Sequence, residues 1–97
     1  MYKLSVIVPV YDTGEYIYRN LHECIKEFKK YGANFEIIVV DDGSTDTTRE
    51  EAMLVDSEHV RVVGYSRNMG KGYALKTGFQ YVTGDVVTFM DGDLELP

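Results

Sequence analysis

The 97-residue chain has few cysteines, few positive charges and no long apolar run, and each shortage excludes a class of protein. Its one cysteine, Cys24, rules out an internal disulfide framework, which fits a reducing compartment. The chain has 10 Lys and Arg against 16 Asp and Glu, so its net charge is −6. Nucleic-acid binders, by contrast, carry basic patches. No run of about 18 apolar residues could span a membrane, and the first residues lack a signal-peptide layout. We therefore expect a cytoplasmic protein without a nucleic-acid partner.

Two glycine signatures for phosphate binding are also missing. The sequence has no G-x-G-x-x-G after its first strand pattern and no G-x-x-x-x-G-K-[ST]. These patterns let the backbone approach phosphates in nicotinamide enzymes and in P-loop NTPases, so both classes are disfavoured. An acidic protein can still bind a phosphorylated ligand if a metal ion lies between the two.

Apolar strand patterns alternate with amphipathic helix patterns along the chain. The predicted strands cover residues 4–10, 35–40, 60–65 and 86–90. The apolar stripes of two intervening helices consist of Ile17, Leu21, Cys24, Ile25 and Phe28, and of Leu75, Gly78, Phe79 and Val82. This alternation predicts βαβ units, a mostly parallel sheet and hence a Rossmann-like three-layer α/β sandwich. With no linker or repeat, we treat residues 1–97 as one unit.

Short polar residues are expected to cap the helices. Asp12 and Glu15 have the spacing of a capping box for the first helix, and Gly32 is expected to end it. Residues 44–46 offer capping side chains for a second helix that runs to about residue 55. Asn68 is the expected cap of the third.

Two acidic clusters each follow a predicted strand. Asp41 and Asp42 end the second strand, and Asp91 and Asp93 follow the fourth. In a parallel sheet the carboxyl ends of the strands share one edge, where ligands bind. Four carboxylates there repel each other unless a cation lies among them, and a hard divalent ion that carries a phosphate ligand suits the place. The alternatives are a polar helix cap for the first cluster and a type I turn for the second.

Residues 68–72, Asn-Met-Gly-Lys-Gly, form a third motif at the start of a helix. Backbone N–H groups face outward at such a position and favour anions, so Lys71 is a candidate phosphate contact. A solvated surface lysine is the alternative interpretation. Tyr11, just after the first strand, could stack on a nucleobase or simply pack.

Four motifs in this order resemble family 2 glycosyltransferases with the A-type nucleotide-sugar fold. They are residues 5–12, 39–46, 68–74 and 90–97. The closest likeness is to polyprenyl-phosphate (dolichyl-phosphate type) glucosyl- and mannosyltransferases. The resemblance implies metal-assisted, inverting transfer of a sugar from a UDP- or GDP-linked donor to an acceptor such as a polyprenyl phosphate.

The resemblance also implies roles for individual residues. The implied nucleotide-binding residues are Pro9, Tyr11, Asp12, Asp41, Asp42, Lys71 and Asp91. Within this set Asp42, with Asp41, would hydrogen-bond the base, and Lys71 would lie near the diphosphate. Asp91 and Asp93 would hold Mg²⁺ or Mn²⁺. The sequence departs from the family pattern at Asp12, where asparagine is frequent, and at Gly92, where alanine is common.

The chain is about half as long as a catalytic domain of that family. We expect residues 1–97 to be the N-terminal, donor-binding half, with the catalytic residues and the acceptor site beyond Pro97. On this view the chain alone is inactive, and the longer parent can associate with a membrane through its acceptor. An interrupted sheet exposes an unpaired edge, so we also expect self-association.

Two other functions are consistent with parts of the sequence. The chain could bind a nucleotide without transferring a sugar. It could also be a receiver-like phosphoacceptor domain, since those place acidic pairs at strand ends. The latter needs its acidic pair after the first strand, which here ends in Pro9-Val10-Tyr11, so it is disfavoured.

Overall fold

In the computed structural model, which describes residues 2–91, four parallel strands form one sheet in the order β3-β2-β1-β4. The strands are β1 (Leu4–Val10), β2 (Phe35–Asp42), β3 (Val60–Tyr65) and β4 (Val86–Phe89). The helices are α1 (Ile17–Lys30), α2 (Thr48–Met53) and α3 (Lys71–Phe79). None of these helices is long and apolar enough to cross a bilayer. The predicted alternation and the parallel sheet are confirmed.

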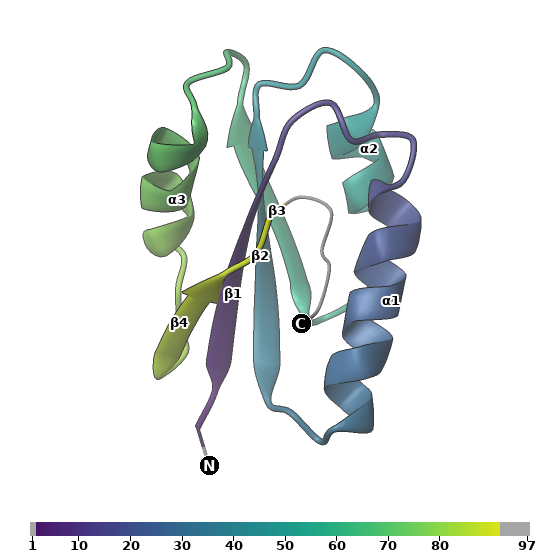
Figure 1. The fold of residues 1–97 in the computed structure, drawn as a ribbon, viewed down its shortest axis with the longest axis vertical. Helices are drawn as coiled ribbons and strands as arrows, with labels where there is room; N and C mark the ends of the chain where they lie inside the picture. The colour runs from purple at the N-terminus through teal and green to yellow at the C-terminus, as the bar shows by residue number, and fades with distance from the viewer. Residues whose placement is uncertain (1, 92–97) are drawn as a thin grey trace.

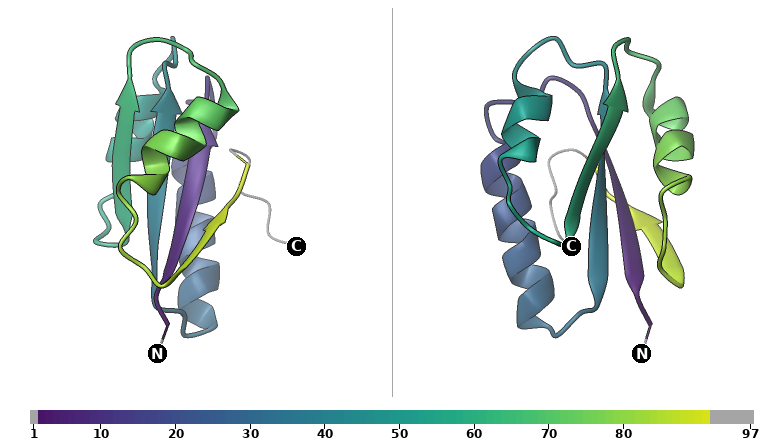
Figure 2. Two further views of the ribbon diagram at one scale, coloured as in Figure 1. Left: turned by 90° about the vertical axis from the view of Figure 1, so that its left-hand side faces the viewer. Right: turned by 180° about the vertical axis from the view of Figure 1, so that it is seen from behind.

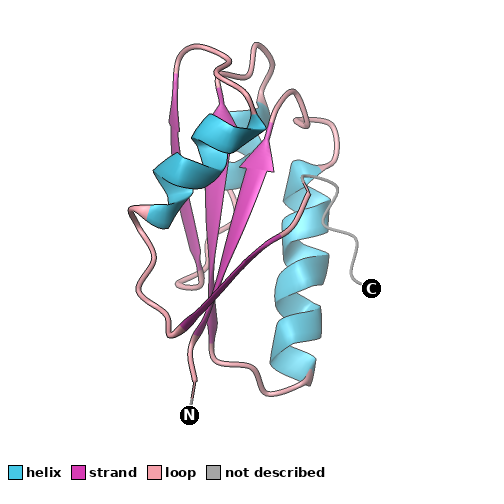
Figure 3. Ribbon diagram, turned by 60° about the vertical axis from the view of Figure 1, so that its left-hand side comes forward, coloured by secondary structure: helices cyan, strands magenta, loops and turns pink. Residues whose placement is uncertain are grey.

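The helices cover both faces of the sheet (Figures 1 and 2), which makes three layers. Helices α1 and α2 pack on one face and α3 on the other, as Figure 3 also shows. Successive residues of a strand point to opposite faces, so β1 and β2 supply apolar side chains to two cores. Val6 and Val39 belong to the larger core under α1, whereas Ile7 and Ile38 belong to the smaller core under α3. This double burial explains the unbroken apolar runs of both strands.

The C-terminus of α1 is the one expected from the sequence. Gly32 adopts a φ of +69°, a left-handed conformation that favours glycine. Its N–H donates to the carbonyl of Lys29 at 3.0 Å, and the N–H of Ala33 donates to that of Phe28 at 3.0 Å. These two bonds form a Schellman motif, so the prediction that Gly32 ends the helix is confirmed.

The helix N-termini differ from the prediction at two of three positions. Asp46 accepts a hydrogen bond from the Thr48 N–H at 2.9 Å and thus serves α2 as expected. Asp12 does not cap α1, and Asn68 does not cap α3. Asp12 instead accepts from the Thr45 N–H, and Asn68 donates to Asp42. Asp12 thus bonds to the loop after β2 and Asn68 to the last residue of β2, which local spacing could not indicate.

Strand β4 is less buried than its sequence suggested. It pairs with β1 from Val86 opposite Leu4 to Phe89 opposite Ile7, and all its residues are exposed. It ends one residue before the predicted end at Met90. Phe79, which we placed in the apolar stripe of α3, is also exposed. Helix α3 packs over β1 and β2. Strand β4 is an outer strand of the described sheet, so it has a strand neighbour, β1, on one side.

A polar network at the amino ends of the strands places β4 beside β1. The Glu36 carboxylate accepts hydrogen bonds from the Ser5 hydroxyl at 2.6 Å and from the Thr83 N–H at 2.7 Å. The N–H of Gly84 donates to the Ser5 hydroxyl at 2.8 Å, and Lys3 donates to the Thr83 hydroxyl at 2.8 Å. The turn between α3 and β4 is therefore held by residues of β1 and β2.

The network predicts a pH-dependent contribution of Glu36 to stability. Partial burial raises the pKa of Glu36, but hydrogen bonds from Ser5 and Thr83 and the charge of Lys3 outweigh it, so the pKa lies below 4.5. The stabilisation is complete above 4.5 and is lost as the pH falls through the lowered pKa. Glu36→Gln should reduce the free energy of unfolding at neutral pH by about 1–2 kcal/mol and have little effect in strong acid.

Urea unfolding at both pH values measures this difference. Glu23→Gln on the exposed side of α1 is the matched control and should change little at either pH. An equal loss for Glu36→Gln at neutral and strongly acidic pH would contradict the role assigned to the network.

Candidate functional site

A cavity of about 300 Å³ lies at the carboxyl ends of the strands. It is lined by Pro9, Val10, Tyr11, Asp42, Asn68, Gly70, Lys71 and Asp91. Strand β1 has β2 on one side and β4 on the other, so the chain order reverses there. Such a reversal point is where open α/β sheets bind ligands. The structure thus brings together five of the residues predicted for the site: Pro9, Tyr11, Asp42, Lys71 and Asp91.

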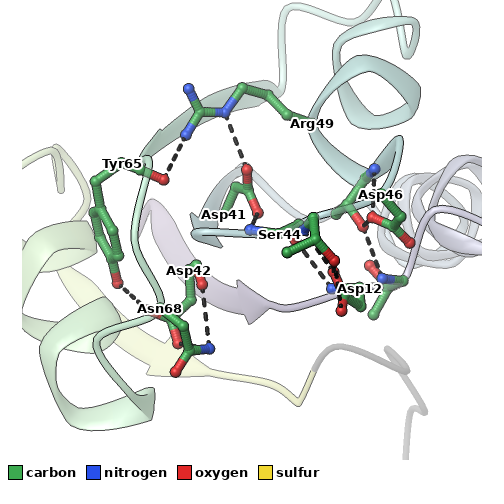
Figure 4. A network of polar contacts seen from close by, with 11 residues as sticks. Asp12, Asp41, Asp42, Ser44, Asp46, Arg49, Tyr65 and Asn68 are labelled. Atoms are coloured by element: carbon green, nitrogen blue, oxygen red, sulfur yellow. Dashed lines mark hydrogen bonds and ion pairs between the residues drawn. The ribbon is translucent and has the colours of Figure 1, made fainter.

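The Asp42 carboxylate is 5% exposed and accepts hydrogen bonds from four described donors. Oδ1 accepts from the Tyr65 hydroxyl at 2.7 Å and from the Met69 N–H at 2.8 Å. Oδ2 accepts from the Asn68 side chain at 3.1 Å and from the Gly70 N–H at 3.0 Å. Figure 4 shows Tyr65 and Asn68 reaching this carboxylate. The carboxylate therefore binds strand β3 and the loop between β3 and α3, residues 66–70.

Two further contacts hold Tyr65 in place beside its hydrogen bond to Asp42. Its ring meets the ring of Tyr73 edge-on, with 5.1 Å between centroids. Its backbone carbonyl accepts from Arg49 at 3.1 Å. Burial and the neighbouring Asp42 carboxylate raise the pKa of Tyr65, so the hydroxyl stays a donor over the physiological range.

Asp41 points to the opposite face of the sheet, because consecutive strand residues alternate. Its carboxylate accepts from the Ser44 N–H at 3.0 Å and pairs with Arg49 Nε at 3.1 Å (Figure 4). It lines a second cavity of about 240 Å³, together with Asp46, Arg49 and other residues near α2. The structure thus separates the two adjacent carboxylates and does not bring Asp41 into the first cavity.

Asp12 is exposed and joins two loops rather than lining the first cavity. Its N–H donates to the Ser44 hydroxyl at 3.0 Å, and its carboxylate accepts from the Thr45 N–H at 2.8 Å. Asp12 adopts a φ of +51°, which is uncommon for a residue other than glycine. Asp46 accepts from the Gly14 N–H at 3.0 Å in the same region. Although burial raises the pKa of Asp46, its hydrogen bonds outweigh that effect and lower it.

Gly43 brings the loop after β2 against the loop after β3. Its φ is +68°, and a Cβ there would lie 2.2 Å from the carbonyl carbon of Arg67 and 2.4 Å from the backbone nitrogen of Asn68. Backbone atoms on both sides leave no space for a side chain. The glycine after the acidic pair is therefore required by this contact as well as by its conformation.

Lys71 and Asp91 face each other at the rim of the first cavity. The Lys71 ammonium lies 2.7 Å from Asp91 Oδ1, and both side chains are exposed. No group of three His, Cys, Asp or Glu within residues 2–91 could hold a metal ion. A single carboxylate still fits the way Mg²⁺ binds, with one or two carboxylates and the phosphates of a substrate. Asp93, the second predicted ligand, lies outside the described residues.

Several residues that line the two cavities were not predicted as site residues from the sequence. We predicted Asn68 as a helix cap, yet it lines the first cavity and bonds to Asp42. Arg49, which pairs with Asp41 from the first turn of α2, carried no local signal. The motif of residues 68–72 did indicate a segment that lines the first cavity, through Asn68, Gly70 and Lys71.

Comparisons with known proteins agree on one family. The family model "Glycosyl transferase family 2" matches residues 5–97. An undecaprenyl-phosphate 4-deoxy-4-formamido-L-arabinose transferase from Proteus mirabilis (strain HI4320) is 38% identical over 98 residues, which cover 98% of this chain and 30% of that protein. The chain therefore spans about 30% of the length of such curated relatives.

Two solved structures are similar in fold and share at least 30% identity. The mannosyltransferase PcManGT from Pyrobaculum calidifontis, in complex with GDP-Man and Mn²⁺, is 30% identical with a TM-score of 0.82, and the match covers 95% of this chain and 28% of that one. S. aureus TarS 1–349, in complex with UDP-GlcNAc, is 34% identical with a TM-score of 0.80, covering 94% and 26%. Both are longer than the chain described here.

The close approach at Gly43 gives a sharp test of how the two loops pack. Gly43→Ala should cost more than the roughly 1–2 kcal/mol of left-handed strain, because the added Cβ also collides with backbone. Gly32→Ala is the matched control, since Gly32 has nearly the same φ, +69°, and a Cβ added there would have no atom within 4 Å. Urea unfolding of both variants should show the larger loss for Gly43→Ala. Equal losses would mean that the loops move apart freely.

Proposed function

The chain belongs to glycosyl transferase family 2, and we propose that its first cavity binds the nucleotide diphosphate part of a sugar donor. The observation that carries this proposal is the placement of Tyr11, Lys71 and Asp91 around one cavity at the reversal point of the sheet. An aromatic ring, an ammonium group and an exposed carboxylate are suited to a base, a diphosphate and a phosphate-bound cation. The two similar structures that were solved with GDP-Man and UDP-GlcNAc support it.

The proposed reaction transfers a sugar from a UDP- or GDP-linked donor to an acceptor oxygen. The acceptor attacks the anomeric carbon from the face opposite the diphosphate, so the bond to the diphosphate breaks and the configuration inverts. Lys71, at the rim of the cavity, offsets negative charge on the departing diphosphate. Asp91, together with Asp93, would hold Mg²⁺ or Mn²⁺, which supplies Lewis-acid stabilisation of the leaving group when bound.

We propose a polyprenyl phosphate as the acceptor. The Proteus mirabilis relative is named as an undecaprenyl-phosphate transferase, which supports a lipid phosphate. A phosphate oxygen is already ionised near neutral pH and needs little help from a general base, whereas a hydroxyl would need one within hydrogen-bond reach. This acceptor would bring the parent protein to a membrane. The acceptor site and the catalytic residues would then lie beyond residues 1–97, since these residues span about 30% of the length of the curated relatives.

The alternative function is nucleotide binding without transfer. It is favoured for residues 1–97 alone, because they span about 30% of the length of the curated relatives. Binding and transfer are measured separately, so the two are readily distinguished. If the chain binds UDP or GDP but transfers no sugar from the donor to a polyprenyl phosphate, it has the alternative function.

We also propose that the outer side of β4 pairs with a second copy of the chain. Val86, Val87 and Phe89 are exposed on this strand, and it pairs with β1 on its other side. Unpaired strand edges with apolar side chains promote association. Light scattering over a range of concentrations should show a mass above that of the monomer, and a clean monomer would contradict the proposal.

The nucleotide site is tested by calorimetric titration of UDP and of GDP, with and without Mn²⁺. We expect one nucleotide to bind, about tenfold more tightly with Mn²⁺ than without it, which corresponds to about 1.4 kcal/mol. Asp91→Asn should remove most of the gain from Mn²⁺, because it removes the charged oxygen at the cavity rim. Asp56→Asn, at an exposed position outside the cavity lining, is the matched control.

Two results would contradict the proposed site. If neither nucleotide binds, the first cavity is not a donor site in this chain. If the gain from Mn²⁺ survives in Asp91→Asn, the cation is held elsewhere.

A further inference from the structure

We propose that Asp12 is the positioning residue of Tyr11, whose ring meets the base in the proposed nucleotide site. The inference rests on the proposed function, because it concerns how one wall of the same cavity is held. Asp12 itself makes no contact with the nucleotide. It acts by fixing the loop after β1, residues 11–16, to the loop after β2, residues 43–47.

Tyr11 lies between two fixed points of the backbone. Val10, the last residue of β1, pairs with Asp41 of β2. Asp12 follows Tyr11 and bonds to the loop of residues 43–47 through both its backbone and its side chain. Tyr11 lines the first cavity, whereas Asp12 is absent from the lining. The place of the Tyr11 ring at the cavity therefore depends on the bonds that Asp12 makes.

The hydrogen bonds of Asp12 run in both directions between the two loops. Its N–H donates to the Ser44 hydroxyl at 3.0 Å. Its Oδ1 accepts from the Thr45 N–H at 2.8 Å and from the Thr45 hydroxyl at 3.2 Å (Figure 4). These bonds hold Asp12 at a φ of +51°, a left-handed conformation that aspartate and asparagine adopt more readily than other residues with a side chain.

The next two residues bond to the same part of the chain without the Asp12 side chain. The Thr13 N–H donates to the Thr48 hydroxyl at 2.7 Å, and the Gly14 N–H donates to the Asp46 carboxylate at 3.0 Å. A Cβ on Gly14 would lie 2.6 Å from Oγ1 of Thr47, so the two loops are in close contact here. A variant at Asp12 should therefore leave the loops together and release Tyr11.

The test is a double-mutant cycle of Asp12→Ala with Tyr11→Ala. Isotope-labelled chains are titrated with UDP, GDP and inorganic pyrophosphate in separate NMR experiments, all with Mg²⁺. We expect Asp12→Ala alone to weaken nucleotide binding about fivefold, and by less than about twofold when Tyr11→Ala is already present. Pyrophosphate has no base and should bind all four chains with the same affinity.

Three results of this cycle would overturn the proposal. If Asp12→Ala weakens the nucleotide by the same factor with and without Tyr11, Asp12 does not act through that ring. If pyrophosphate is weakened as much as the nucleotide, Asp12 supports the whole site and not the wall beside the base. If Asp12→Ala leaves nucleotide affinity unchanged, Tyr11 does not depend on Asp12.

Asp12→Asn is the conservative variant that should restore binding. Its amide oxygen can still accept from Thr45, and asparagine tolerates the left-handed conformation. We expect its affinities for all three probes to stay within about twofold of the wild-type values. A loss equal to that of Asp12→Ala would overturn the proposal, because the charge of Asp12 and not its bond to Thr45 would then matter.

A second measurement does not depend on any ligand. In the free chain, the Thr45 amide should exchange its hydrogen several-fold faster in Asp12→Ala than in Asp12→Asn, and the ring signals of Tyr11 should shift more in Asp12→Ala. Equal Tyr11 signals in the two variants would overturn the positioning role. The expected shifts in a chain whose wild type binds none of the three probes would support that role and overturn the proposed function.

Discussion

A buried carboxylate must have its charge stabilised by hydrogen bonds, and Asp42, a residue that is 5% exposed, receives these from the next strand and loop of the chain. The tip of β2 is thereby tied to Tyr65 at the end of β3 and to the backbone that enters α3. Gly43 follows at once and lets the two loops touch. The cavity walls formed by residues 66–71 exist in their observed position because this one charge has to be satisfied.

The alternation of side chains along a strand divides the carboxyl edge into two sites. Asp41 and Asp42 are adjacent in sequence, but they serve opposite faces of the sheet, one bound to Arg49 and the other to the loop of residues 66–70. The first cavity lies on the side of Asp42 and opens toward Lys71 and Asp91. The two adjacent carboxylates are therefore stabilised separately, Asp41 by the charge of Arg49 and Asp42 by uncharged hydrogen-bond donors. This arrangement leaves Lys71 at the rim of the first cavity, where we propose that a diphosphate binds.

Much of the fold could be predicted from the sequence because its signals are local. Apolar periodicity placed the strands and helices, and Gly32 marked the end of α1. The candidate roles of Lys71 and Asp91 also followed from position, at a helix start and after a strand, and the resemblance to a family narrowed them to a diphosphate and its metal ion. The prediction of helix caps from short polar residues failed for Asp12 and Asn68. Their positions suit a cap, yet both side chains bond to residues distant in sequence, Thr45 and Asp42. Long-range partners of this kind, like the exposure of an outer strand, follow from topology and not from neighbouring residues.

The first cavity is proposed to hold the nucleotide diphosphate of a sugar donor. A crystal structure of the chain soaked with UDP and, separately, with GDP tests this most directly. We expect one of the two ligands in the first cavity, between Tyr11 and Lys71. A ligand in the second cavity beside Arg49, or no ligand in either cavity, would contradict it.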